Sequence, residues 1–260
     1  MPMLGFGTYT LARRVTKHFV EVALQQGYRL IDTAHYYGNE TEVGQAIQAS
    51  GIDRQDIFVT TKVDTSGYAA TKQLLASTLP KFGGYADLVI IHWPQRDSLG
   101  TWRALEEVYQ ANQVRAIGVS NFNARETADL INNATIPPML DQIETHLYWQ
   151  QQKMHRQLMQ QRIVHESYSP LGEGMHGMLA DPLLRKLAVQ YGKSPAQIIL
   201  RYLMQKDIVV IPKSENETHM RENFELFDFE VTATDCARLA TLDKHQSMGG
   251  WMQSMEEDQY

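Results

Sequence analysis

The chain has 260 residues, 43% of them hydrophobic and 21% charged, which suits one large globular domain with a substantial core. The net charge of −6, with basic residues scattered along the chain, argues against a nucleic-acid partner, and the single cysteine excludes an internal disulfide. No signal peptide is recognisable, and no apolar run approaches the roughly 18 residues that span a membrane, so we expect a cytoplasmic protein without a membrane partner.

Short apolar runs alternate with longer amphipathic segments along the whole sequence. The short runs, rich in Ile, Val, Leu and Thr, predict strands at 3–9, 29–34, 57–63, 87–93, 116–120, 139–144, 163–169 and 208–212. Helices are predicted between them at 16–26, 40–49, 69–80, 99–112, 123–132, 150–161, 194–205 and 217–226. Ser194 and Pro195 open one helix as cap and first helical residue.

This alternation, without a hairpin signal or a linker, predicts a parallel sheet in one α/β domain covering residues 1–260. At this length a (β/α)8 TIM barrel is the economical closure, and an open doubly wound sheet is the alternative. The first strand-to-helix turn lacks a dinucleotide-binding fingerprint, which disfavours the open sheet. Residues 172–177, GEGMHG, have the glycine spacing of that fingerprint but follow the seventh strand, so we interpret them as a flexible loop beside the barrel mouth.

Seven of the eight predicted strands end in side chains that ionise or form strong hydrogen bonds. In chain order these are Asp32, Lys62, His92, Ser120 with Asn121, Gln142 with Glu144, Tyr168 with Ser169, and Lys213 with Ser214. The active sites of barrels lie at the carboxyl ends of the strands. Asp32, Lys62 and His92 lie on consecutive strands, so we expect them to meet at one edge of the mouth. The loop after Asp32 brings Tyr36 and Tyr37 to the same edge.

These residue types suit the donation of a proton to a carbonyl group. A nearby lysine lowers the pKa of a tyrosine, an aspartate keeps the lysine charged, and a histidine orients the carbonyl oxygen. Reduction also needs a hydride, which no side chain supplies, so a nicotinamide cofactor is implied. The residues alone leave open whether Tyr36 or Tyr37 is the donor. No serine lies beside His92 as in a hydrolase, and no ligand spacing predicts a metal site.

The later strand ends suit the binding of that cofactor. Asn121 and Gln142 can hydrogen-bond a carboxamide, and Tyr168 can stack on the nicotinamide ring. Lys213 and Ser214 can bind a phosphate.

Three long motifs carry a resemblance to a known family. They are GYRLIDTAHYYGNETEVG at 27–44, VRAIGVSNF at 114–122, and IPKS at 211–214 with ENF at 222–224. Over nearly all its length the chain resembles the aldo-keto reductases, and most of all the short prokaryotic enzymes of the 2,5-diketo-gluconate reductase and aldehyde reductase type. The resemblance implies a (β/α)8 barrel, a monomer, and NADPH-dependent reduction of a small carbonyl substrate.

The resemblance also implies roles for individual residues. The catalytic tetrad would be Asp32, Tyr37, Lys62 and His92, with Tyr37 as the proton donor and Tyr36 as loop support. The residues implied to hold the cofactor, from the carboxamide through the pyrophosphate to the adenosine, are Ser120, Asn121, Gln142, Tyr168, Ser169, Leu171, Lys213, Ser214, Glu222 and Asn223. The residues implied to line the substrate pocket are Tyr9 and Trp93.

Two departures from the family pattern concern the adenosine end of the cofactor. His219 stands where the family usually has an arginine that would clamp the 2′-phosphate of NADPH, and a neutral histidine holds it less well. Glu215 is an unusual acid at its position, would repel that phosphate, and would accept from a 2′-hydroxyl. Because Lys213 still favours a phosphate, we expect NADPH to be used with weakened selectivity over NADH, with His219 among the cofactor contacts.

Other departures concern the mouth and the ends of the chain. Asp64 replaces a residue that is often aromatic in relatives, which predicts a more polar pocket mouth. The start of the chain is short, without the usual N-terminal hairpin. The C-terminal tail is expected to form a loop over the mouth, with Trp251 and Met252 as a lid on the substrate pocket, and a disordered end is the alternative.

Two other functions fit the same fold. A nucleotide-binding regulatory or scaffold protein with little turnover is disfavoured by the complete tetrad. An isomerase or hydrolase without nicotinamide is disfavoured by the nucleotide-holding residues on the later strands.

Overall fold

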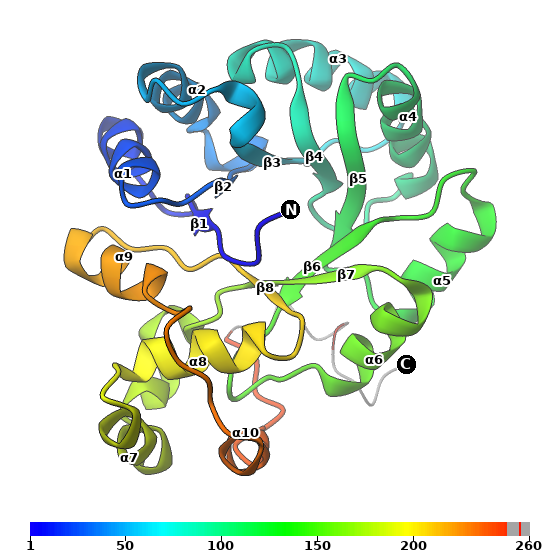
Figure 1. Cartoon of the computed structure of the whole chain (residues 1–260). Coiled ribbons are helices and arrows are strands. Elements are labelled where there is room, and N and C mark those ends of the chain that lie inside the picture. The colour runs from blue at the N-terminus through cyan, green and yellow to red at the C-terminus, as the bar shows by residue number, and fades with distance from the viewer. Residues whose placement is uncertain (249–254, 256–260) are drawn as a thin grey trace.

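Eight parallel strands lie side by side in the order in which they follow one another along the chain (Figure 1). The structure is a computed structural model that describes residues 1–248 and Met255. The strands are β1 (Phe6–Gly7), β2 (Leu30–Asp32), β3 (Phe58–Val63), β4 (Ala86–Ile91), β5 (Val114–Ser120), β6 (Leu140–Glu144), β7 (Val164–Tyr168) and β8 (Val209–Val210).

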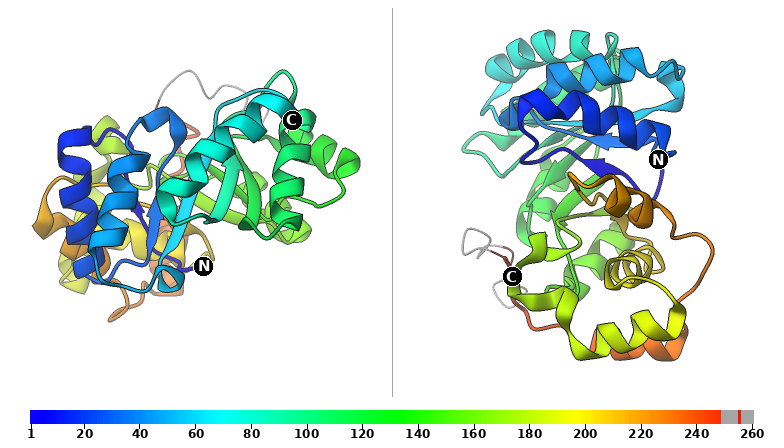
Figure 2. Two further views of the ribbon diagram at one scale, coloured as in Figure 1. Left: turned by 90° about the horizontal axis from the view of Figure 1, so that it is seen from above. Right: turned by 90° about the vertical axis from the view of Figure 1, so that its left-hand side faces the viewer.

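Helices surround the sheet in each of the three views (Figures 1 and 2). They are α1 (Arg13–Gln25), α2 (Glu40–Ala49), α3 (Tyr68–Thr78), α4 (Ser98–Gln110), α5 (Ala124–Asn133), α6 (Gln152–Gln161), α7 (Pro182–Tyr191), α8 (Pro195–Met204), α9 (Glu217–Phe224) and α10 (Ala233–Ala240). Within residues 1–248, none of them is long and apolar enough to cross a membrane.

The first and last strands of the sheet are joined by the segment that precedes β1. The backbone N–H of Gly5 donates to the carbonyl of Val210 at 2.8 Å, and the N–H of Val210 donates to the carbonyl of Met3 at 3.0 Å. The sheet is therefore curled and TIM-barrel-like, which confirms the predicted parallel α/β arrangement. The open doubly wound alternative is wrong, because its strand order would not run consecutively from β1 to β8.

The first and last strands, β1 and β8, are shorter than predicted. The expected strands 3–9 and 208–212 shrink to two residues each, Phe6–Gly7 and Val209–Val210. Gly7 donates to the carbonyl of Pro212 at 3.2 Å, but Pro212 has no N–H with which to continue the ladder. The stretch 172–177 lies within 3-10 turns over Gly172–Ala180, which lead into α7.

Side chains alternate between the two faces of the strands, and this alternation positions the polar residues at the mouth. Leu30, Ile90 and Leu140 are buried in small apolar clusters on one face. Asp32 and Gln142 follow Leu30 and Leu140 by two residues and so share that face. The opposite face packs against the helices in the main core.

Candidate active site

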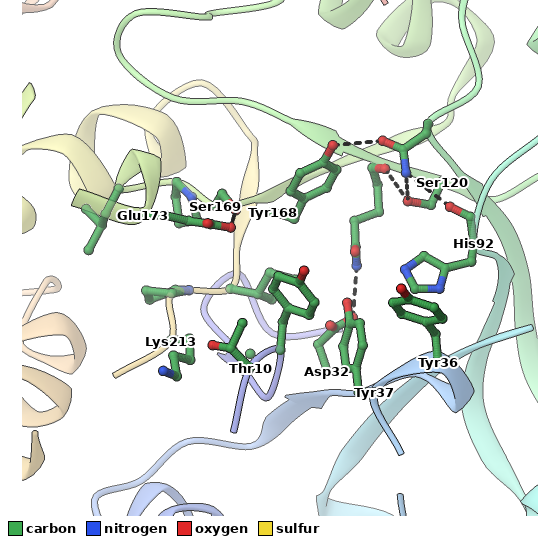
Figure 3. A pocket seen from close by; sticks show the side chains of 18 of the residues that line it. Thr10, Asp32, Tyr36, Tyr37, His92, Ser120, Tyr168, Ser169, Glu173 and Lys213 are labelled. Atoms are coloured by element: carbon green, nitrogen blue, oxygen red, sulfur yellow. Dashed lines mark hydrogen bonds between the residues drawn. The ribbon is translucent and has the colours of Figure 1, made fainter. Parts of the chain in front are cut away.

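A cavity of about 470 Å³ opens where the strands end, and polar side chains from several of them face it (Figure 3). The predicted site residues that line the cavity are Tyr9, Asp32, Tyr37, His92, Trp93, Ser120, Asn121, Gln142, Tyr168, Ser169, Leu171 and Lys213. The others in the described part of the chain are not among its lining residues, namely Lys62, Ser214, His219, Glu222 and Asn223. Trp251 and Met252 of the expected lid lie outside the described residues.

Lys62 of β3 lies beside the cavity and joins the other groups of the predicted tetrad. Its Nζ donates to Asp32 Oδ1 at 2.5 Å, to the Thr33 carbonyl at 3.0 Å and to the Tyr37 hydroxyl at 3.2 Å. Three acceptors match the three protons of an ammonium group, which lets a charged lysine be almost wholly buried. Burial lowers the pKa of Lys62, but Asp32 and Tyr37 outweigh that effect and raise it above its ordinary value. Lys62 is therefore cationic at neutral pH.

The two adjacent tyrosines have different surroundings. A 3-10 turn at His35–Tyr37 ends at Gly38, whose φ of 68° is the left-handed conformation that glycine adopts readily. This turn brings Tyr37 to Lys62, whereas Tyr36 is 62% exposed and meets Trp93 edge-on, with ring centroids 5.4 Å apart. Only Tyr37 therefore has the lysine neighbour that the predicted proton donor requires.

Burial raises the pKa of Tyr37 to about 12, although Lys62 alone lowers it. The expected lowering of the pKa by Lys62 is present, but the loss of solvent around the half-buried phenol outweighs it. Tyr37 consequently keeps its proton at neutral pH.

His92 is a neutral imidazole beside Tyr37. Burial and then the charge of Lys62 lower the pKa of His92 to about 2. Its ring stacks on Trp93 at 3.6 Å and lies 5.6 Å from the Tyr37 ring, between centroids. A neutral imidazole carries one N–H, so His92 can donate a hydrogen bond to a carbonyl oxygen without itself being an acid.

Side chains predicted to hold the carboxamide and to stack on the nicotinamide ring bind one another. The Tyr168 hydroxyl donates to Asn121 Oδ1 at 2.9 Å, and Asn121 Nδ2 donates to the His92 carbonyl at 3.0 Å and to Ser120 Oγ at 3.1 Å (Figure 3). Asn121 adopts a φ of 63°, which asparagine tolerates better than most residues. The contacts hold this wall of the cavity in one arrangement.

Gln142 contacts a carboxyl group, that of Glu166, which the sequence did not single out. Its Nε2 donates to Asp32 Oδ2 and to Glu166 Oε2, both at 2.9 Å. Burial raises the pKa of Glu166 to about 8, and Asp32 adds to this effect. A signal for Glu166 was present, because it precedes Tyr168 by two residues on the same strand and so shares its face.

Acidic groups accompany the predicted phosphate contacts. Lys213 Nζ lies 2.7 Å from Glu215 Oε1, and Ser169 Oγ donates to Glu173 Oε1 at 3.0 Å. His219 is exposed on α9, and its backbone N–H donates to the side chain of Asn216. The only strongly basic side chain lining the described cavity, that of Lys213, is thus already paired.

Asp64 also has a polar partner. Its Oδ1 lies 2.8 Å from Nδ1 of His35, which precedes the two tyrosines of the mouth.

Comparisons with known proteins agree with this geometry. The model of the aldo/keto reductase family matches residues 3–244. Methylglyoxal reductase DkgA of Yersinia pestis is 38% identical over 253 residues, which cover 96% of this chain and 91% of the relative. Glyoxal reductase of Bacillus subtilis is 38% identical over 254 residues, with coverage of 96% and 91%.

A solved structure extends the likeness to three dimensions. The aldo-keto reductase MGS-M4, from a deep-sea metagenome library of the Medee basin, superposes with a TM-score of 0.92 at 38% identity, covering 95% of this chain and 93% of that one. The family model and the relatives span almost the whole sequence and confirm the resemblance carried by its three motifs. The chain therefore belongs to the aldo/keto reductase family of oxidoreductases.

Proposed function

We propose that the protein is an NADPH-dependent reductase of small aldehydes or ketones, such as keto sugars, 2-oxoaldehydes or aromatic aldehydes. The observation that carries the proposal is the position of Lys62 Nζ between Asp32 and Tyr37, at 2.5 and 3.2 Å, beside a neutral His92. We further propose that it acts as a monomer, as the family resemblance implied, and in the cytoplasm, as expected from the sequence pattern.

The cavity suits a nicotinamide dinucleotide, which when bound supplies the hydride for the carbonyl carbon. Polar amides, an aromatic ring and a lysine line the same cavity, in keeping with a carboxamide, a nicotinamide ring and a phosphate. The residues proposed to hold the cofactor are Ser120, Asn121, Gln142, Tyr168, Ser169, Leu171, Lys213, Ser214, His219, Glu222 and Asn223. Of these, the last four are proposed on the family motif alone, since they do not line the cavity.

The chain's own groups would carry the proton chemistry. His92 donates its N–H to the substrate carbonyl oxygen and orients it. Tyr37 then gives its proton to that oxygen as negative charge develops there. The Lys62 ammonium stabilises the resulting phenolate and so opposes, without cancelling, the rise in the pKa of the half-buried Tyr37 phenol. Asp32 keeps Lys62 in place and charged.

The aromatic side chains at the mouth would select the substrate. Tyr9, Tyr36 and Trp93 all line the cavity, and Tyr9 lies 5.0 Å from Tyr37 between ring centroids. We propose that they contact the part of the substrate beyond the carbonyl; Trp251, also expected there from the sequence, lies outside the described residues.

The phosphate end supports weakened selectivity for NADPH over NADH. Lys213 would meet the 2′-phosphate, but Glu215 pairs with it at 2.7 Å and would itself repel that phosphate.

The first test is steady-state oxidation of NADPH and NADH with methylglyoxal and with an aromatic aldehyde. Wild type is compared with Tyr37→Phe and with the matched control Tyr36→Phe. We expect turnover to be lost only in Tyr37→Phe, while cofactor binding, measured by fluorescence quenching, persists in both variants. Tight cofactor binding without turnover by wild type would instead favour a nucleotide-binding regulatory protein.

A further inference from the structure

Glu166 is a buried carboxyl group that the proposed mechanism does not use. It lies in the middle of β7, paired in register with Gln142 of β6, and its residue exposure is 0%. Its Oε2 accepts from Gln142 Nε2 at 2.9 Å, while Oε1 is buried without a partner among the described residues. Burying an ionisable group with one of its oxygens unpaired costs free energy of folding. The one contact that Glu166 makes is therefore a candidate for a functional role.

That contact fixes the orientation of a side-chain amide. Gln142 Nε2 lies 2.9 Å from an oxygen of Asp32 as well as from one of Glu166. An amide oxygen facing two carboxyl groups, at least one of them anionic, would be repelled, so the amino group must face them. Both of its N–H bonds are then used, and the amide oxygen is the atom left for the cavity that Gln142 lines.

Asp32 alone would not fix this orientation as firmly. Its other oxygen is bound by Lys62 at 2.5 Å, so Asp32 is positioned by the catalytic lysine. Glu166 supplies a second acceptor from a different strand. With acceptors on two strands, any rotation of the Gln142 amide breaks at least one of its two hydrogen bonds.

We propose that Glu166 is a positioning residue that, with Asp32, locks the Gln142 amide so that the cavity meets a hydrogen-bond acceptor rather than a donor. The inference rests on the proposed function. An acceptor at this point is complementary to the N–H groups of a nicotinamide carboxamide. It disfavours a carboxylate in the same place, which has only acceptor oxygens. Glu166 thereby determines which pyridine dinucleotides the site accepts.

The test compares the Kd of NADP⁺ with that of its nicotinic acid analogue, which carries a carboxylate instead of the carboxamide, by isothermal titration calorimetry. We expect wild type to favour NADP⁺ by about tenfold or more, because a mismatched polar pair costs at least about 1.4 kcal/mol. Glu166→Met fills the same space without an acceptor and should reduce this ratio to about twofold. Glu166→Gln retains an acceptor oxygen and should keep the wild-type ratio.

Binding of 2′,5′-ADP, which lacks the nicotinamide half, separates positioning from a general structural role. Its Kd should be the same in wild type, Glu166→Met and Glu166→Gln. An unchanged NADP⁺ preference in Glu166→Met, or an equal loss for all three ligands, would overturn the proposal. If Glu166→Met does not fold, Gln142→Met serves instead, and a wild-type ratio in that variant also overturns it.

The same titrations distinguish this inference from the proposed function. Wild type that binds none of the dinucleotides would overturn both. If wild type binds NADP⁺ and reduces carbonyls, but Glu166→Met keeps the wild-type ratio of the two Kd values, only the role of Glu166 is overturned.

Discussion

The Nζ atom of Lys62 lies 3.2 Å from the hydroxyl of Tyr37, inside a site whose burial raises the pKa of that phenol to about 12. Burial therefore opposes the release of the proton, and the ammonium favours it. This opposition makes the lysine indispensable to a proton donor of this kind.

Replacing Lys62 with methionine should lower kcat about 100-fold or more, because the phenolate of Tyr37 loses its stabilising charge. Cofactor binding should change little, since Lys62 does not line the cavity. The measurements are kcat and the cofactor Kd, with Lys72→Met as the control because Lys72 pairs with Glu107 on the surface. Wild-type kcat in Lys62→Met would exclude this role.

The same substitution should destabilise the fold by about 3 kcal/mol, because it leaves Asp32 as a buried carboxylate without its cation. Urea unfolding followed by circular dichroism measures this loss of unfolding free energy. Unfolding at the assay temperature also shows whether both proteins are folded in the kinetic comparison.

Replacing Glu215 with glutamine should raise the preference for NADPH over NADH about tenfold, because Lys213 is then free to meet the 2′-phosphate. The measurement is the ratio of kcat/KM for the two cofactors at low ionic strength, where screening is weakest. Glu217→Gln, which removes an exposed acid paired with His18, is the matched control. An equal ratio in wild type and Glu215→Gln would show that the pair does not affect selectivity.

His165 should make the fold sensitive to acid. Burial lowers its pKa well below the ordinary value, and the neighbouring His155, 3.1 Å away between Nδ1 atoms, lowers it further. Below about pH 6.5 the unfolded chain binds a proton at His165 and the folded chain does not. The free energy of unfolding is therefore highest above pH 6.5 and decreases as the pH falls. The loss is about 2 kcal/mol between pH 7 and pH 5.

The measurement is the free energy of unfolding at several pH values in His165→Gln and in the control His18→Gln, whose histidine is exposed. The His165 variant should show a flatter acid slope than wild type, and the control should not. Parallel slopes in all three proteins would show that His165 takes up a proton in the folded state.

Glu166 should have the opposite pH dependence. Its folded pKa of about 8 lies above the ordinary 4.5, so the folded chain holds a proton that the unfolded chain has released. The stability from this group is fully present below pH 4.5 and is lost as the pH rises to about 8. Glu166→Gln should flatten this alkaline loss, by up to about 1.4 kcal/mol per pH unit, relative to the exposed control Glu230→Gln. Identical profiles would mean that Glu166 is ionised in the folded protein throughout this range.

Much of the fold and the site could be predicted from the sequence because strand alternation is a local property. A period of two residues places Asp32 on the face of Leu30 and Gln142 on the face of Leu140, whatever the rest of the chain does. The consecutive strand order follows from the regular alternation of strands and helices.

The tertiary structure decided what depends on neighbours distant in sequence. The turn at Gly38 brings Tyr37, and not Tyr36, to Lys62, and the residue types alone left that choice open. The net pKa of Tyr37 depends on how deeply the assembled barrel buries it, which no pattern in the loop shows. The contact between Gln142 and Glu166 depends on the register of β6 against β7. Register and burial are set by packing across the whole sheet, and for this reason only the folded chain reveals them.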